Sequence, residues 1–207
     1  MILESICVGA FQVNCYVLAS GKESSAIIID PGDEKRKIEQ ILNKYKLNPI
    51  FIINTHGHID HIGCDNEFGI PIYIHRDEIP LLKDASLNLS NFLSRSFKVK
   101  SHLIRPLNDK EIIELEGIRL EVIHTPGHTP GAMCLLMKSP KNKILFTGDT
   151  LFFHSIGRTD FPGADERFLI RSIKDKLFNL ADDTLIYPGH GPPSTIGEEK
   201  RNNPFLY

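Results

Sequence analysis

Four side chains that commonly bind metal ions lie within six positions in the first third of the chain. His56, His58, Asp60 and His61 form the pattern His-x-His-x-Asp-His directly after an apolar run. Burying so many polar groups without partners would cost several kcal/mol, which argues against a purely structural role. Imidazole and carboxylate together suit Zn²⁺, Fe or Mn rather than Ca²⁺. The pattern therefore predicts a transition-metal site.

Three further candidate ligands follow later, and each lies beside a glycine near the end of an expected strand. They are His128, Asp149 and His190, within the segments 125–129, 146–150 and 187–191. Each segment alone would indicate only a turn. Together with the first cluster they supply seven ligands, enough for two metal ions that share one carboxylate.

The hydrophobic pattern shows which elements must position these ligands. The continuous apolar run at 49–54, which ends just before His56, is typical of a strand buried on both faces. Helical spacing places Ile38, Ile41, Leu42 and Tyr45 on one face of a helix that Asp33 would cap. A second helix is expected at 166–178, with Asp165 as its cap.

Short strands are expected in most of the remaining segments. They cover 2–7, 13–19, 26–29, 111–115, 118–124, 132–137, 144–146 and 184–187, while 70–108 should hold a strand and one or two helices. The segment 150–163 is expected to be an irregular loop. Mixed helices and strands with polar strand ends indicate a layered α/β protein whose site lies on loops, and 207 residues favour one domain, 1–207.

In this order the motifs resemble those of the metallo-β-lactamase fold superfamily, from Asn14-Cys15-Tyr16 to the C-terminus. They are most similar to its glyoxalase-II-like thioester hydrolases. The resemblance implies a four-layer αββα sandwich with the metals at one edge. It also implies one metal held by His56, His58 and His128. A second metal would be held by Asp60, His61 and His190, with Asp149 as the bridge.

The resemblance implies hydrolysis of a small thioester, such as S-lactoylglutathione, by a metal-bound hydroxide, with Asp60 and Asp149 as catalytic residues. Two metals about 3.5–4 Å apart can hold a shared hydroxide and polarise a carbonyl, and metal binding lowers the pKa of water to about 7. Zinc is the expected metal, with iron or manganese as alternatives. Asp30, Thr55 and Asn14 are expected to support the ligands.

Arg158 and His154, in the loop after Asp149, are the candidate substrate-binding residues. A guanidinium suits a substrate carboxylate, although Arg158 could equally pair with Asp160 or Asp165. Glyoxalase II carries a lysine near this position, and its longer members add a C-terminal helical domain that binds glutathione. Only 17 residues (207 − 190) follow His190 here, which leaves the identity of the thiol open.

Several other functions are alternatives to thioester hydrolysis. A persulfide dioxygenase of the same fold also carries a Gly-Arg-Thr-Asp loop, as at 157–160, and its single iron would use His56, His128 and Asp149. A β-lactamase is disfavoured, because such enzymes are exported and the common kind uses a cysteine ligand at the second metal. A metal-binding module without turnover is disfavoured by the complete ligand set.

Composition limits the partners and the compartment. A formal net charge of −2 provides no broad basic face for nucleic acid, and no apolar run approaches the ~20 residues of a membrane span. The N-terminal residues lack the positive charge of a signal peptide. Four cysteines without a C-x-x-C pair predict reduced core residues in a cytoplasmic protein. A monomer or homodimer is expected. The expected core thiols are Cys7, Cys15, Cys64 and Cys134, and the expected solvated histidines are His75, His102 and His124.

Overall fold

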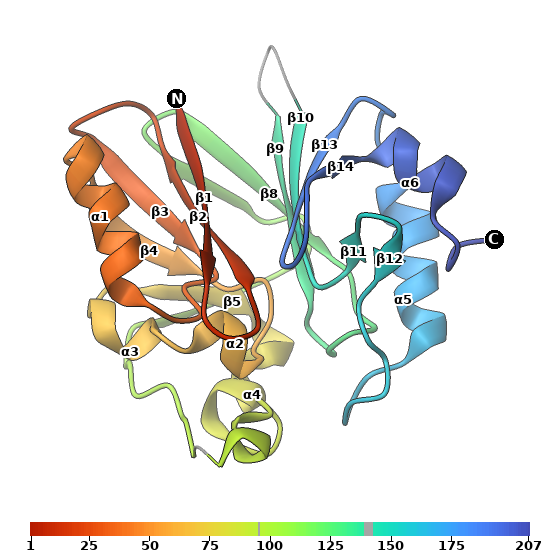
Figure 1. Cartoon of the computed structure of the whole chain (residues 1–207), viewed down its shortest axis with the longest axis horizontal. Helices are drawn as coiled ribbons and strands as arrows, with labels where there is room; N and C mark the ends of the chain where they lie inside the picture. The colour runs from red at the N-terminus through yellow and green to blue at the C-terminus, as the bar shows by residue number, and fades with distance from the viewer. Residues whose placement is uncertain (95, 139–142) are drawn as a thin grey trace.

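Two six-stranded sheets pack face to face in the computed structural model, which describes residues 1–94, 96–138 and 143–207 (Figure 1). The first sheet has the order β1 (Ile2–Val8), β2 (Val13–Ala19), β3 (Ser25–Ile29), β4 (Asn48–Ile53), β5 (Ile72–His75) and β6 (Ile104–Leu107). The second has the order β14 (Ser194–Thr195), β13 (Leu185–Pro188), β10 (Lys143–Gly148), β9 (Met133–Lys138), β8 (Ile118–His124) and β7 (Ile112–Leu115).

Helices cover the outer face of each sheet (Figure 1). The first sheet is covered by α1 (Lys35–Tyr45), α2 (Ile59–Ile62), α3 (Asp65–Phe68), the 3-10 turns η1 (Arg76–Glu78) and η2 (Ser90–Leu93), and α4 (Ile79–Lys83). The second is covered by α5 (Glu166–Ser172), its π-helical continuation η3 (Ile173–Leu177), and α6 (Ile196–Asn202). No helix in the described ranges is long and apolar enough to cross a bilayer.

Three hydrophobic clusters hold these four layers together. Along β2, Tyr16 and Leu18 point into the cluster between the sheets, whereas Cys15 and Val17 point into the cluster beneath α1. This alternation is the period of two that a strand imposes, and it leaves both faces of the strand buried. A third cluster, which includes Leu169, joins α5 to the second sheet. The structure therefore confirms the predicted αββα sandwich.

Three local expectations prove wrong. The segment 150–163 contains a small hairpin, β11 (Leu151–Phe152) with β12 (Ser155–Ile156). Asp33 does not cap α1, because Glu34 precedes the helix in a left-handed conformation and Asp33 Oδ1 instead accepts a hydrogen bond from Glu34 N at 2.7 Å. Cys7 is exposed on the edge strand β1, whereas the other three cysteines are buried.

The start of α5 is capped as the sequence predicts, and this cap can be tested. Asp165 Oδ1 accepts hydrogen bonds from the N–H groups of Arg167 at 2.8 Å and Phe168 at 3.2 Å. Asp165→Ala should lower the free energy of unfolding by about 1 kcal/mol, measured by urea denaturation. The control Asp175→Ala should have little effect, because its exposed pair with Arg171 contributes little. Equal losses in the two variants would contradict the capping role.

Candidate metal centre

The seven predicted ligands converge at one edge of the sandwich, on the segments that follow four strands. His56, His58, Asp60 and His61 follow β4 and continue into α2. The other three follow strands of the second sheet: His128 after β8, Asp149 after β10 and His190 after β13. Both sheets therefore contribute to one site.

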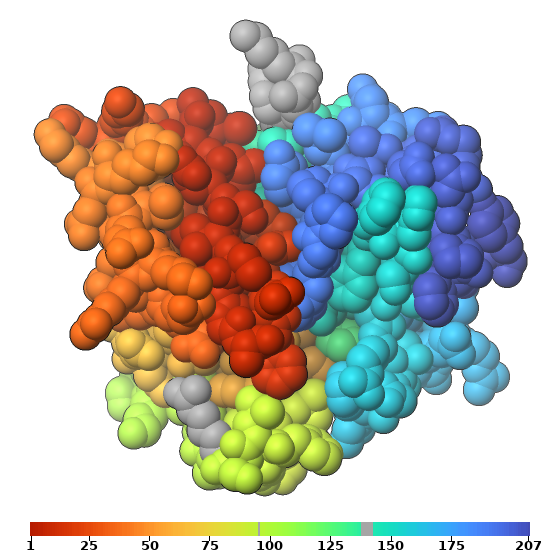
Figure 2. Space-filling view, in the orientation of Figure 1, coloured from red at the N-terminus to blue at the C-terminus, as the bar shows by residue number. Residues whose placement is uncertain are grey.

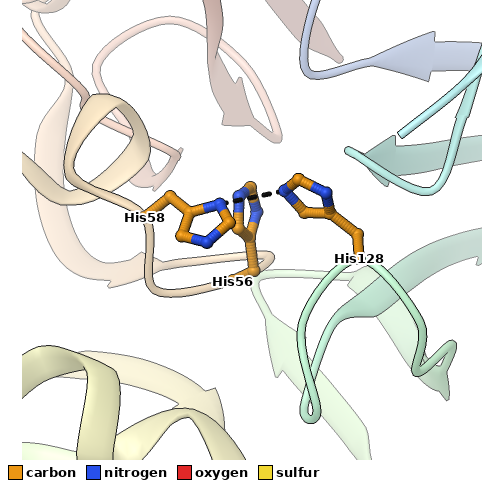
Figure 3. Close-up of side chains that lie close together, drawn as sticks. All are labelled: His56, His58 and His128. Atoms are coloured by element: carbon orange, nitrogen blue, oxygen red, sulfur yellow. Dashed lines mark hydrogen bonds between the residues drawn. The ribbon is translucent and has the colours of Figure 1, made fainter. Parts of the chain in front are cut away.

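The first group of ligands consists of three buried histidines whose rings point toward one another (Figure 3). His128 Nε2 lies 2.9 Å from His58 Nδ1, and the three rings form a triangle, with centroids 4.7 Å apart for His58 and His128 and 4.8 Å from His56 to each. One ligand nitrogen from each of the three lies within 4.8 Å of the others. This arrangement allows one metal ion to contact all three.

The second group contains Asp60, His61 and His190, whose ligand atoms also lie within 4.8 Å of one another. Asp60 Oδ2 is 3.4 Å from His190 Nε2 and 3.9 Å from His61 Nε2. His61 is buried, while His190 remains partly exposed. A second ion could therefore be held here and still be reached from solvent.

Asp149 lies between the two groups and contacts both. Its Oδ1 is 3.3 Å from His61 Nε2, and its Oδ2 is 3.6 Å from His128 Nε2 and 3.5 Å from His190 Nε2. Gly189 makes this placement possible, since a Cβ atom there would lie 2.3 Å from Asp149 Oδ1. One carboxylate thus reaches ligands of both groups.

Backbone carbonyls orient two of the histidines from behind. His128 Nδ1 lies 2.7 Å from the Arg158 carbonyl oxygen, and His190 Nδ1 lies 3.0 Å from that of Phe11. A carbonyl oxygen can only accept, so each Nδ1 carries a proton and each Nε2 faces the centre, where it can bind a metal ion in its unprotonated form.

Asp30 and Thr55 serve the same purpose for the histidines after β4. Asp30 Oδ2 lies 3.0 Å from His61 Nδ1, and both Asp30 oxygens accept from Thr55, from its N–H and its hydroxyl, at 2.7 Å. These contacts hold Asp30 in a left-handed conformation, with φ 51°. Thr55 Oγ1 is 3.2 Å from His56 Nδ1. The structure thus brings both expected supporting residues to the ligands.

Asn14 supports the site through the backbone instead of through a ligand. Its side-chain amide donates to the carbonyl oxygens of Pro188 at 3.0 Å and Gly191 at 2.9 Å, which flank His190. The Tyr16 hydroxyl also donates to the Pro188 carbonyl, at 2.6 Å. The first sheet therefore fixes the loop that carries a ligand from the second.

The donor set fits a metal ion. His56 Nε2 is buried and has no hydrogen-bond partner among the residues that the structure describes. A buried nitrogen left in this state is costly unless an ion occupies the position toward which it points. Burial lowers the pKa of His56 and, with His128 nearby, lowers that of His58 to about 3. Both imidazoles are therefore neutral, which is the form that binds metals.

The second group has a different charge. Burial disfavours a proton on His61 or His190, but the carboxylates around them outweigh burial. Asp149 and Asp60 raise the pKa of His190 to about 9, and Asp149 and Asp30 raise that of His61. The carboxylates are correspondingly ionised, since these histidines overcome burial and lower the pKa values of Asp149 and Asp60.

Glu78 is a buried residue of the site that the sequence did not reveal. Its Oε2 accepts a hydrogen bond from Gly57 N at 2.7 Å, and its Oε1 accepts one from Gly131 N at 2.6 Å. It therefore joins the loop between His56 and His58 to the loop that carries His128. No local pattern around Glu78 distinguishes it from a solvent-exposed acid.

The two candidate substrate residues have different surroundings. Arg158 lies at the rim of the cavity beside the ligands, and its guanidinium forms two hydrogen bonds with Asp160, at 2.9 and 2.7 Å. The structure thus contains the internal ion pair that was the alternative for Arg158. His154 contacts Glu198 at 2.8 Å and does not line that cavity.

The remaining histidines are not all in solvated positions. His102 is exposed, as expected. The expectation for His75 is wrong, because its ring is buried and stacks on His124 with centroids 4.0 Å apart and an angle of 10°. The pair forms because β5 and β8, in different sheets, end beside each other, and local sequence carries no sign of that proximity.

Comparisons with known proteins agree with this geometry. The family model described as the metallo-beta-lactamase superfamily matches residues 8–190. Hydroxyacylglutathione hydrolase GloC of Haemophilus influenzae is 39% identical over 219 residues, which span 100% of this chain and 98% of that protein. Among solved structures, BLEG-1 B3 metallo-beta-lactamase superposes with a TM-score of 0.90 at 37% identity, covering 99% of each chain. TTHA1623, solved in a di-iron-bound form, gives a TM-score of 0.82 at 35% identity, covering 98% and 100%.

The contact between Asp30 and His61 predicts a loss of metal affinity when the charge is removed. Asp30→Asn should weaken metal binding about 10- to 100-fold, because His61 loses the carboxylate that orients it. Competition with a fluorescent chelator measures this affinity. Asp33→Asn is the matched control, since that carboxylate is exposed and accepts a hydrogen bond from Glu34 N in its own turn. Unchanged affinity in Asp30→Asn would contradict the orienting role.

Glu78 predicts a pH dependence of stability. Burial raises its pKa from 4.5 to about 7, against the opposing effect of its hydrogen bonds. The folded protein therefore holds this proton more tightly than the unfolded chain. Its contribution is fully present below pH 4.5 and is lost as the pH rises to about 7.

As the pH rises from 4.5 to about 7, the unfolding free energy of the wild type should fall relative to that of Glu78→Gln. The expected change is about 3 kcal/mol, at 1.36 kcal/mol per pKa unit. Urea denaturation of both proteins at a series of pH values, with a chelator present, measures the difference. If the unfolding free energies of the two proteins change with pH in parallel, the raised pKa of Glu78 would be contradicted.

Proposed function

Because this chain belongs to the metallo-beta-lactamase superfamily, we propose that it is a metal-dependent hydrolase that cleaves a small thioester such as S-lactoylglutathione. The observation that carries the proposal is Asp149, whose carboxylate lies between two groups of three ligands. Such an arrangement suits two ions that act on one bond. The similarity to hydroxyacylglutathione hydrolase GloC supports the thioester as the substrate class.

We propose that the centre holds two divalent ions, zinc first, with iron or manganese as alternatives. His56, His58 and His128 would hold one, Asp60, His61 and His190 the other, and Asp149 would bridge them. When bound, such a pair of ions polarises a carbonyl and makes water nucleophilic near neutral pH. The di-iron form of the similar TTHA1623 supports the count of two.

The chain's own side chains orient this centre. Backbone carbonyls hold the Nδ1 protons of His128 and His190, so their Nε2 atoms face the centre. The ionised carboxylates of Asp60 and Asp149, proposed as catalytic residues, line the cavity where a substrate would lie. These groups are fixed before substrate arrives, which lowers the cost of reorganisation.

A second candidate is hydrolysis of a β-lactam, and the observation in its favour is the similarity to BLEG-1. Both reactions break a bond to an acyl carbon, so the surroundings of the centre must decide between them. Purified protein should therefore be tested against thioesters, esters, lactones and β-lactams, with metal stoichiometry measured on the same sample. We expect thioester hydrolysis with two metals per chain.

Other outcomes of this panel would exclude the proposal. One iron per chain with oxygen uptake on glutathione persulfide would identify a dioxygenase, and β-lactam cleavage without thioester cleavage would favour the second candidate. Metal binding with no turnover of any substrate would leave a binding module.

The bridging role of Asp149 gives a direct prediction. Asp149→Asn should reduce bound metal and lower thioester hydrolysis at least about 100-fold. Asp175→Asn, which changes an exposed carboxylate on η3, serves as the control and should leave both quantities unchanged. Elemental analysis and initial rates on the same preparation provide the measurement. Retention of both properties in Asp149→Asn would rule out the bridge.

We propose that the protein acts in a reducing compartment, as expected for the cytoplasm. The support is that its four cysteines, Cys7, Cys15, Cys64 and Cys134, are all free. We also propose that the substrate is a small molecule and that the protein is a monomer or homodimer.

A further inference from the structure

We propose that the substrate of this site carries an apolar chain next to its scissile bond, so that the site prefers an alkyl or aryl thioester to a glutathione thioester such as S-lactoylglutathione. This inference rests on the proposed function and specifies its substrate class. It follows from the walls of the cavity above the ligands, which are far more apolar than the ligands beneath them.

The cavity has a volume of about 540 Å³, within the usual range for sites that enclose small molecules. Polar ligands form its base, including Asp60, Asp149 and His190. Its walls are apolar side chains drawn from three separate segments, chiefly Phe11, Leu89, Phe92, Leu93, Phe152 and Phe161. A substrate that reaches the base must therefore lie against hydrocarbon on several sides.

Aromatic rings approach both groups of ligands. The Phe161 ring lies edge-on to His58, with centroids 5.6 Å apart, and the Phe152 ring lies edge-on to His190 at 6.0 Å. Apolar surface thus begins directly beside each group of ligands. A charged group placed next to the scissile bond would lose its hydration here without gaining a partner.

Several of these side chains are exposed to water in the protein alone. Phe92 is 76% exposed, Phe11 52% and Leu93 44%. Their segments are the β1–β2 turn, in red, and the η2 region, in yellow-green, and both meet the loop after β12, in cyan, on the face shown in Figure 2. Clustered exposed apolar side chains commonly mark binding sites, because a ligand that covers them is stabilised by their burial.

The charges around the cavity do not suit glutathione. Within the described ranges, Arg158 is the one lysine or arginine that lines the cavity. Its charge is already matched by Asp160, and its guanidinium lies 4.4 Å from the centre of the Phe161 ring. Among the described residues that line the cavity, no further lysine or arginine would match the two carboxylates of a glutathione thioester.

Chain-length series test the inference and separate the two sides of the bond. One series varies the acyl group of N-acetylcysteamine thioesters from acetyl to octanoyl, and the other varies the thiol of acetyl thioesters from ethanethiol to octanethiol. We expect kcat/KM to rise about two- to fourfold per methylene in at least one series and to exceed that for S-lactoylglutathione. Flat values in both series would overturn the inference.

A binding measurement keeps this test independent of turnover. Metal-loaded protein should bind the octyl thioether of N-acetylcysteamine more tightly than the ethyl thioether, as measured by calorimetry. If the octyl thioether binds more tightly while no thioester is hydrolysed, the proposed function fails and the apolar site remains. If thioesters are hydrolysed without any effect of chain length on rate or binding, the apolar site fails and the proposed function remains.

Phe92 provides the decisive variant, because its exposure means that truncation should not disturb folding. Phe92→Ala should lower the ratio of kcat/KM for the longest and shortest substrates about tenfold. Phe168→Ala is the matched control, since Phe168 is 57% exposed on α5 and lies outside this cavity. An unchanged ratio in Phe92→Ala, or an equal change in both variants, would overturn the inference.

Discussion

The structure depends on one constraint: polar ligands buried at the junction of two sheets must be brought together by both. The first sheet supplies the residues after β4, and the second supplies His128, Asp149 and His190. No part of this centre is complete until the apolar faces of the two sheets pack against each other. The hydrophobic cluster between the sheets therefore sets the positions of the ligands as well as contributing to stability. Polar links then fix the junction, for example Glu78 between Gly57 and Gly131, and Met133 N to Thr55 O at 3.0 Å.

The two halves of the centre differ in charge, and this difference determines how they respond to a cation. His56 and His58 are neutral because burial lowers their pKa values, so they offer lone pairs directly. His61 and His190 instead hold protons that balance Asp149 and its neighbouring carboxylates. An ion at the second group must displace those protons, whereas His56 and His58 at the first group are already in the form that binds a metal ion. Loading of the second position is therefore coupled to proton release.

The sequence predicted what is encoded locally and missed what depends on contacts between distant segments. Four ligands were recognisable from their density after an apolar run, and the other three because each follows a strand and lies beside a glycine. Glu78 and the stacked pair of His75 and His124 were missed, since their roles arise only when the two sheets meet. The hairpin of β11 and β12 was missed because two-residue strands leave almost no periodic signal.

Reactivity and selectivity are located on different parts of this chain. The ligands follow β4, β8, β10 and β13, so the packed core of the sandwich holds their positions. Phe11, Phe92 and Phe161 instead lie on turns and loops at its edge, where a change of side chain disturbs little packing. A bound apolar chain that covers these walls would exclude water from the ligands, and this exclusion would strengthen the electrostatic interactions within the centre. The same side chains that would select an apolar chain would thus also create, once the chain is bound, the dry surroundings in which carboxylates and imidazoles act most strongly.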